Sequence, residues 1–184
     1  MVKIDTLLRE KKISLINELE IDRYVNFFDN SYKDSLNHSN KNKEEFPRWS
    51  IISGYYAMHD ITKLLLAKKF KIKIELEVHA TTIKVLHEFI KNKEIIQLIE
   101  NGYKEFLNLA NDLEEAKKER VKVQYYTGTK FLKEEYKKRA EEFYIRIVLP
   151  YLEKIKELLK EKDQTKEDKK QVESHNIVEG GKSK

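Results

Sequence analysis

The segment 51–67 is apolar on nearly every side of a helix, which is the pattern of a central, buried helix. Polar residues recur within it at spacings of three to four, and they are Ser53, Tyr56, His59, Asp60 and Lys63. At these spacings they fall along one line of the helix surface. Because buried polar groups must be satisfied inside the protein, at an interface or in a cleft, this line is a candidate functional feature.

Helical periodicity covers most of the remaining chain. It predicts a first helix over about residues 2–38 with a bend near 20–22, a polar linker at 37–43, and a helix that opens at Pro47 and ends near Phe70. Further helices are predicted over 81–91, over a short stretch that ends near Gly102, and over about 103–123. The last helix begins near Lys130 and should kink at Pro150, and its core stripe is Tyr136, Ala140, Phe143, Ile147, Tyr151, Ile155 and Leu158.

Two segments depart from helical spacing. Residues 71–78 alternate apolar with charged residues as a strand does, but a lone strand has nothing to pair with, so we expect an extended connector or a hairpin arm exchanged with a partner. Residues 161–184 are almost all polar or charged, which predicts a disordered tail. The sequence therefore predicts an all-α, antiparallel bundle of four to five helices over residues 1–160.

Composition narrows the class of protein. Of 184 residues, 40% are hydrophobic and none is cysteine, which excludes disulfides, thiolate nucleophiles and zinc–thiolate sites. Because no apolar run could span a membrane and the N-terminus lacks the apolar core of a signal peptide, we expect a cytoplasmic protein without a membrane partner. Charged residues make up 38% with mixed signs, typical of solvated helix faces, and the net charge of +5 mildly favours nucleic acid.

Two histidines are candidate chemical groups. His59 has Tyr56 and Asp60 beside it, and these could set its tautomer or charge, although a satisfied core histidine gives the same pattern. His79 falls at the start of the helix after the connector, where the helix dipole disfavours the imidazolium. The alternative role for His79 is to cap or pack the helix entry.

Arg120 is the leading candidate for ligand binding. It continues the apolar stripe formed by Phe106, Ala110, Leu113 and Ala116. Because a guanidinium cannot neutralise itself, an arginine on an apolar face needs a carboxylate, a phosphate or a cleft. Gln124, Tyr125 and Tyr126 follow closely, and an arginine with aromatic hydroxyls is a candidate site for RNA or a nucleotide. A structural arginine at a dimer interface is the alternative.

The sequence contains no motif for metal, nucleotide-loop or nucleophile chemistry. The sequence contains no metal-ligand spacing, glycine-rich phosphate loop, nucleophile elbow or dinucleotide fingerprint, so we expect neither a metal nor a cofactor. The aromatic residues Phe27, Phe28, Trp49 and Phe143 are expected in the core.

The order of these features resembles the HEPN superfamily over about residues 2–160. The resemblance rests on the tyrosine pair Tyr55-Tyr56 of the central helix, on His79 at the next helix start, and on Arg120 running into Tyr125 and Tyr126. It implies a helical bundle that forms a homodimer. Many HEPN proteins are ribonucleases of toxin–antitoxin and defence systems, and many are encoded beside a minimal nucleotidyltransferase partner.

The nuclease signature of that superfamily is an arginine and a histidine with four to six residues between them. Arg120 matches the arginine, but Tyr125, Tyr126 and Thr127 stand where the histidine would fall. Tyrosine, with an ordinary pKa of about 10, is a poor base near neutral pH. We therefore expect an RNA-, nucleotide- or partner-binding component. The alternatives are a metal-independent ribonuclease that uses Arg120 and a purely structural partner of a nucleotidyltransferase.

Overall fold

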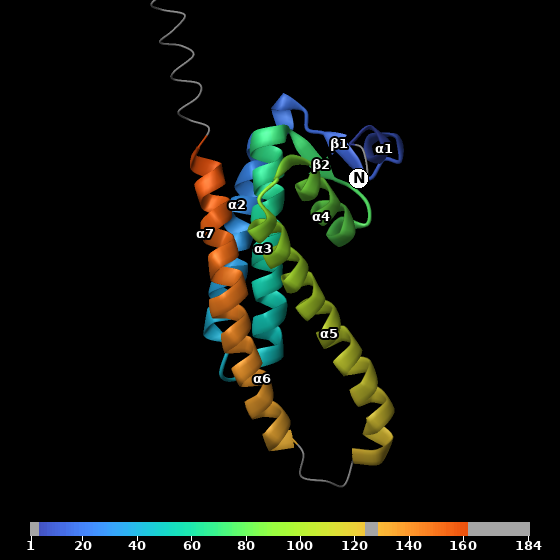
Figure 1. Ribbon diagram of the computed structural model, residues 1–184, viewed down its shortest axis with the longest axis vertical. Helices are drawn as coiled ribbons and strands as arrows, with labels where there is room; N and C mark the ends of the chain where they lie inside the picture. Colours follow the sequence, from blue (N-terminus) through green and yellow to red (C-terminus); the bar gives the residue numbers. More distant parts are fainter. Residues whose placement is uncertain (1–3, 124–128, 162–184) are drawn as a thin grey trace, which may run out of the picture.

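The structure is a computed structural model that describes the backbone of residues 4–123 and 129–161. The side chains of residues 110, 112–123 and 129–132 lie outside this description. The elements are α1 (Ile4–Arg9), β1 (Ile13–Leu15), α2 (Glu18–Lys41), α3 (Pro47–Phe70), β2 (Ile72–Ile74), α4 (Val78–Phe89), α5 (Lys93–Val123), α6 (Thr129–Phe143), the π-helical turn η1 (Tyr144–Val148) and α7 (Leu149–Lys160). Long helices dominate, which confirms the predicted helical bundle, with the addition of a two-stranded sheet (Figure 1).

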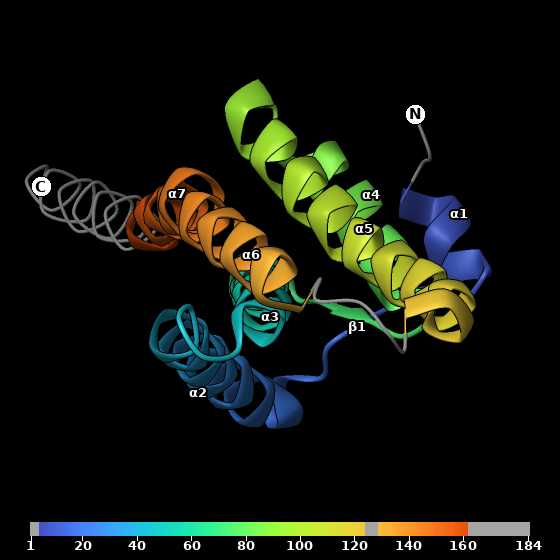
Figure 2. The same cartoon turned by 90° about the horizontal axis from the view of Figure 1, so that it is seen from below.

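Helix α3 is the centre of the bundle, as its apolar sequence predicts. It opens at Pro47, whose fixed φ suits the first helical turn, and it ends after Phe70, as expected. Helices α2, α4, α5, α6 and α7 all pack against it. Figure 2, which views the bundle from below, shows α3 between helix α2 on one side and helices α5 and α6 on the other. The side chains of Ile51, Tyr55, Met58, Ile61 and Leu65 are fully buried in this core.

The N-terminal region differs from the single helix predicted over 2–38. Residues 13–15 form β1, which pairs antiparallel with β2, so that Ile13 lies opposite Ile74 and Leu15 lies opposite Ile72. The expectation that the connector lacks a strand partner is therefore wrong. Residues 13–15 are too few to show a period of their own, and their apolar positions also fitted helical spacing. The sheet and α1 enclose a small second core, made of Leu7, Ile13, Leu66, Ile72, Ile74 and Val85.

Of two predicted interruptions, the linker is shifted toward Pro47 and the helix end at Gly102 is absent. Helix α2 continues to Lys41 through most of the predicted linker at 37–43. Helix α5 runs unbroken past Gly102, where a helix end was predicted. Gly102 is buried, and a Cβ added to it would lie 2.9 Å from Cε of Met58. This glycine therefore allows α5 to approach α3 closely and does not end a helix.

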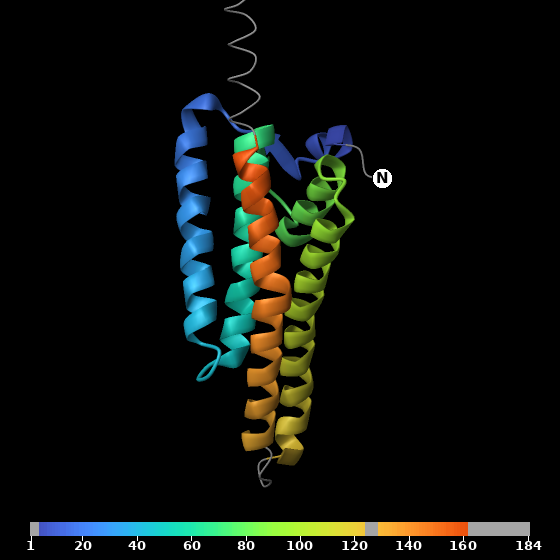
Figure 3. The ribbon, with the colours of Figure 1, turned by 60° about the vertical axis from the view of Figure 1, so that its left-hand side comes forward.

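The predicted disturbance at Pro150 takes the form of a π-helical turn. Helices α6 and α7 follow one another through η1 without a loop, and Pro150 lies just after this turn (Figure 3). A π turn accommodates an extra residue, which shifts the buried face by one position. Val148 is consequently fully buried, whereas Ile147, which the predicted stripe contains, is only partly buried.

Two other expectations concern membranes and the C-terminal tail. Within the described ranges, no helix combines the length and the apolarity that a membrane span requires. The tail predicted over 161–184 lies outside the described residues from 162 onward.

Replacing the central glycine of α3 should destabilise the bundle. A Cβ on Gly54 would lie 2.9 Å from Cγ2 of Val148 and about as close to Ser39 and Phe143, all of them buried. We expect Gly54→Ala to lower the free energy of unfolding by about 1–3 kcal/mol, because a packed core must shift to admit a methyl group. Urea unfolding followed by circular dichroism measures this change.

Gly102→Ala is the matched control. Its added methyl would crowd only the flexible end of Met58, with Tyr55 at an ordinary contact distance of 3.7 Å, and alanine favours a helix over glycine by about 1 kcal/mol. We expect stability within about 1 kcal/mol of the parent protein. Equal losses in the two variants would show that Gly54 has no special packing role.

Candidate functional site

The leading candidates from the sequence are not placed by the described side chains. Arg120 belongs to the last turn of α5, but its side chain lies outside the description. Gln124, Tyr125 and Tyr126 lie outside the described residues altogether. The second group of candidates, on α3 and α4, is described in full.

The polar residues along α3 form hydrogen bonds to two neighbouring helices, α2 and α4. Toward α2, the hydroxyl of Ser31 donates to Oδ2 of Asp60 at 2.6 Å. The Oγ of Ser53 lies 2.7 Å from Nδ1 of His38, a histidine that the sequence placed in a linker. Toward α4, Nε2 of His59 lies 3.1 Å from Oγ1 of Thr82. Of the three alternatives, which were partners inside the protein, at an interface or in a cleft, the first describes Asp60 and, in part, His59.

His59 is a core histidine with one unpaired nitrogen. Its exposed fraction is 1%. The hydroxyl of Thr82 donates its single proton to the carbonyl of Val78 at 2.7 Å, so Nε2–H of His59 must supply the proton of the bond to Thr82. Nδ1 then has no hydrogen-bond partner, and Oδ1 of Asp60 lies 3.6 Å away. A proton added at Nδ1 would therefore face this carboxylate.

Burial keeps His59 neutral. Loss of hydration lowers the pKa of His59 below its ordinary value, and the positive charge of Lys63 acts in the same direction. Asp60 opposes this shift but does not overcome it. Burial also lowers the pKa of Lys63, whose ammonium lies 4.9 Å from the ring centre of Phe28. A neutral imidazole and an ammonium are thus held beside one carboxylate in a partly dry environment.

His79 lies in the first turn of α4 among aromatic rings from α3 and α5. Its Nδ1 is 2.9 Å from the hydroxyl of Tyr55, and its ring centre is 4.8 Å from that of His59. Tyr103 stacks on it at 6.0 Å, and Phe106 lies at 5.5 Å. Burial lowers the pKa of His79, with further contributions from His59 and Lys63. The expected neutral imidazole is supported, although burial rather than the helix dipole is its main cause.

Tyr56 is the most exposed of the side chains around the two histidines. We call these side chains the His59–His79 group, and they are Tyr55, Tyr56, His59, Asp60, Lys63 and His79. Tyr56 is 38% exposed and meets His79 edge to face, with 5.9 Å between ring centres. His79 itself is half-buried. The interior members of the group are structural, whereas Tyr56 and His79 could offer a ring face and a neutral imidazole to a ligand.

Sequence reasoning missed the partners of these groups. Ser31 and Thr82 carry no signal that separates them from other helical hydroxyl residues. Tyr55 stands in the tyrosine pair, but its role as the hydrogen-bond partner of His79 depends on the crossing of α3 and α4. Among the described residues, no cluster of histidine and acidic side chains could hold a metal ion.

Two of the four aromatic residues expected in the core lie at the surface instead. Phe28 and Phe143 are buried as predicted. Trp49 is 59% exposed and Phe27 is 62% exposed, so the expectation for these two is wrong. An exposed aromatic residue and a buried one have the same letter and the same helical spacing, and only the packing distinguishes them.

Comparison of the chain with protein-family models, with curated proteins and with solved structures gives no match. The chemistry of the site therefore rests on its own geometry. The His59–His79 group can donate and accept hydrogen bonds and can present an aromatic surface.

Protonation of His59 should destabilise the fold in acid. Because its pKa in the folded protein lies below 6.5, the unfolded chain binds the proton first as the pH falls. We expect the free energy of unfolding to decrease as the pH drops below about 6.5, by at most about 1.4 kcal/mol per pH unit for this histidine. His79 contributes in the same direction. Urea titrations between pH 8 and pH 5 measure the slope.

His59→Gln should reduce this slope, because glutamine does not titrate. His87→Gln is the matched control, since His87 is exposed and bonds only Glu100 at 2.8 Å among the described residues. An unchanged slope in His59→Gln would show that another group senses the acid.

Proposed function

We propose that this chain is an RNA- or nucleotide-binding helical component that works with a partner, as the HEPN resemblance implies. In that role it would form a homodimer and belong to a toxin–antitoxin or defence module with a minimal nucleotidyltransferase. The observation that best supports the proposal is the continuity of α5 from Lys93 to Val123.

This continuity sets the position of Arg120 in the fold. Helix α5 extends past the turn between α2 and α3, and α6 returns from the same end (Figures 1 and 3). Arg120 lies in the last turn of α5, directly before Gln124, Tyr125 and Tyr126. The backbone of Arg120 therefore lies near the end of α5 that projects beyond the central core. A site at such an end is open to a large ligand.

The same geometry argues against a ribonuclease mechanism that pairs Arg120 with His59 or His79 of the same chain. From Phe106, which touches His79, to Arg120 the helix axis advances by about 21 Å at 1.5 Å per residue. A general base must lie within hydrogen-bond reach of the proton that it removes. His59 and His79 are therefore too far from Arg120 in the same subunit to serve as its catalytic partner. Binding, rather than cleavage, is the activity that we propose.

Arg120→Ala should weaken RNA binding. An arginine that contacts a phosphate contributes to affinity and to its salt dependence, so we expect a higher Kd and a slope of log affinity against log salt that is smaller by about 1. Fluorescence anisotropy of a labelled single-stranded RNA at several salt concentrations measures both quantities.

The control is Arg146→Ala, which removes the same charge from an exposed position of η1. The proposal expects this variant to retain most of the affinity. If Arg120→Ala and Arg146→Ala bound RNA equally well, Arg120 would not be part of the site.

A further inference from the structure

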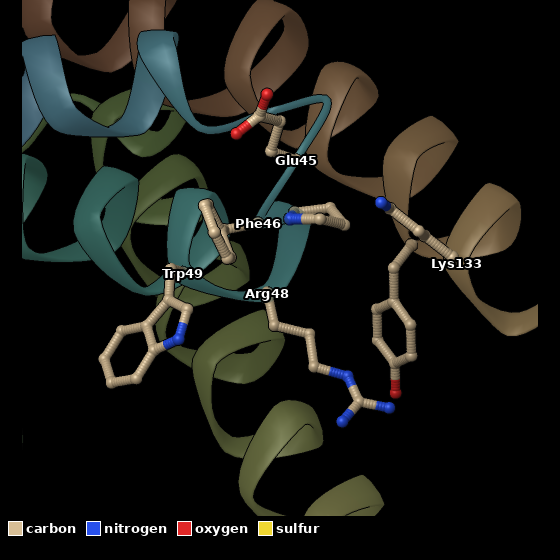
Figure 4. A pocket seen from close by; sticks show the side chains of 7 residues that line it. Glu45, Phe46, Arg48, Trp49 and Lys133 are labelled. Atoms are coloured by element: carbon tan, nitrogen blue, oxygen red, sulfur yellow. The ribbon is translucent and has the colours of Figure 1, made fainter. Parts of the chain in front are cut away.

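A pocket opens at the turn between α2 and α3, where this turn faces α6. Its volume is about 380 Å³. The turn and the first residues of α3 form one side, and α6 forms the other (Figure 4). The residues that matter here are Glu45, Phe46, Arg48, Trp49, Lys133 and Tyr136. None of them belongs to the His59–His79 group, so this is a separate feature of the molecule.

Two aromatic side chains of the pocket are left uncovered. Phe46 is 54% exposed and Trp49 is 59% exposed, and they stand within one turn of each other at the start of α3. Large aromatic residues that remain in water contribute little to folding, and neighbouring ones of this kind are typical of binding surfaces. Figure 4 shows both side chains among those that line the pocket.

Two cationic side chains line the same pocket as these rings. The guanidinium of Arg48 lies 4.2 Å from the ring centre of Tyr136, and a guanidinium in such a contact keeps N–H groups that can bind an anion. Lys133 is exposed on the α6 side of the pocket. Neither Arg48 nor Lys133 forms an ion pair with any residue that the structure describes.

The cations that surround the pocket provide a contrast. Lys43 is paired with Glu141 at 2.8 Å, and Lys137 is paired with Glu44 at 3.4 Å. Because these two lysines have carboxylate partners across the contact between the turn and α6, this pairing of charges does not explain Arg48 and Lys133. Their position favours an external anion.

We propose that this pocket binds single-stranded RNA, with a base stacked on Trp49 and Phe46 and the phosphate backbone held by Arg48 and Lys133. The combination of exposed rings and cations is the one that proteins use for single strands, since every base has a face that stacks. The inference deepens the proposed function, on which it rests, by placing a contact on described residues. The turn between α2 and α3 lies at the same end of the bundle as the end of α5 (Figure 1).

The acidic residue of the pocket, Glu45, allows a test in which RNA affinity should change in the opposite direction. Glu45 is exposed at the rim and would repel a phosphate. If RNA occupies the pocket, Glu45→Gln should bind it more tightly, while Arg48→Gln should bind it more weakly. Opposite effects of two neighbouring neutral substitutions are not expected from a general disturbance of the fold.

Trp49 makes the pocket directly observable, because it is the single tryptophan of the chain. The experiment adds an unlabelled single-stranded RNA of about ten nucleotides, a typical site size, to the full-length protein and records tryptophan emission. We expect saturable quenching as a base stacks on the indole. Inorganic polyphosphate supplies charge without bases and should leave the emission unchanged. Equal quenching by polyphosphate would overturn the stacking arrangement.

Variants test the same contact without relying on tryptophan emission. In anisotropy measurements with labelled RNA, Trp49→Ala should raise the Kd about tenfold, the loss expected for one stacked base. Phe27→Ala is the matched control, since Phe27 is equally exposed but lies on α2 in a different surface region. Arg146→Gln is the matched control for Arg48→Gln.

The outcomes separate this inference from the proposed function. If RNA bound with sensitivity to Arg120→Ala, but without quenching or any effect of Trp49→Ala, the pocket assignment would be wrong and the proposed function would stand. Quenching together with indifference to Arg120→Ala would support the pocket and remove Arg120 from the site. No RNA binding at low salt would overturn both. Dissociation of a dimer by Trp49→Ala would show that a second copy covers the pocket, which also overturns it.

Discussion

The fold depends on how the buried polar groups of α3 are matched by neighbouring helices. The hydroxyls of Ser39 and Ser50 donate to each other's carbonyl groups at 2.8 and 2.7 Å, which joins α2 to α3. The hydroxyl of Thr62 donates to the carbonyl of Met58, so the hydroxyl of Tyr151 on α7 donates to Thr62. A buried donor or acceptor without its partner costs about 1–3 kcal/mol, whereas a satisfied pair gains only about 1 kcal/mol. These bonds therefore select one arrangement of helices more than they add stability.

The hydrogen bonds explain why a helix that is apolar on nearly all sides has a defined rotation. Apolar side chains alone would allow α3 to turn within its surroundings at little cost. Asp60 fixes one side of the helix to Ser31 of α2, while Tyr55 fixes another side to His79 of α4. The close approach at Gly54 sets the distance to α2 and η1. Polar contacts thus set the orientation and the glycine sets the spacing.

The sequence predicted those parts of the fold that local periodicity encodes. The bounds of α3, the start of α6 and the presence of a disturbance at Pro150 follow from proline geometry and from long apolar stripes. The pairing of β1 with β2 did not follow, because three residues are too few to show a period and their partner lies far away in the chain. The shift of the buried face to Val148 was also hidden, since it depends on one extra residue in a helical turn.

For the candidate site, sequence identified His59, Asp60 and His79 but not which of them reach the surface. That depends on the crossing of α3 with α4 and α5, which buries His59 and leaves Tyr56 partly exposed. The same limit applies to Trp49, whose helical spacing matches that of a core residue although it lies in water. The exposure of a side chain depends on which residues pack against it in space, and a single sequence does not show that packing.

The two ends of α3 differ in what they leave unsatisfied, and this difference locates function better than any single motif. Along the middle and the C-terminal half, polar groups such as Asp60 and Thr62 find partners within the chain. At the N-terminal end, Trp49 keeps an uncovered ring, and Arg48 is held by a ring rather than by a carboxylate. These two side chains are therefore available to contact a ligand. They lie at the end of the bundle toward which α5 and α6 project (Figure 3).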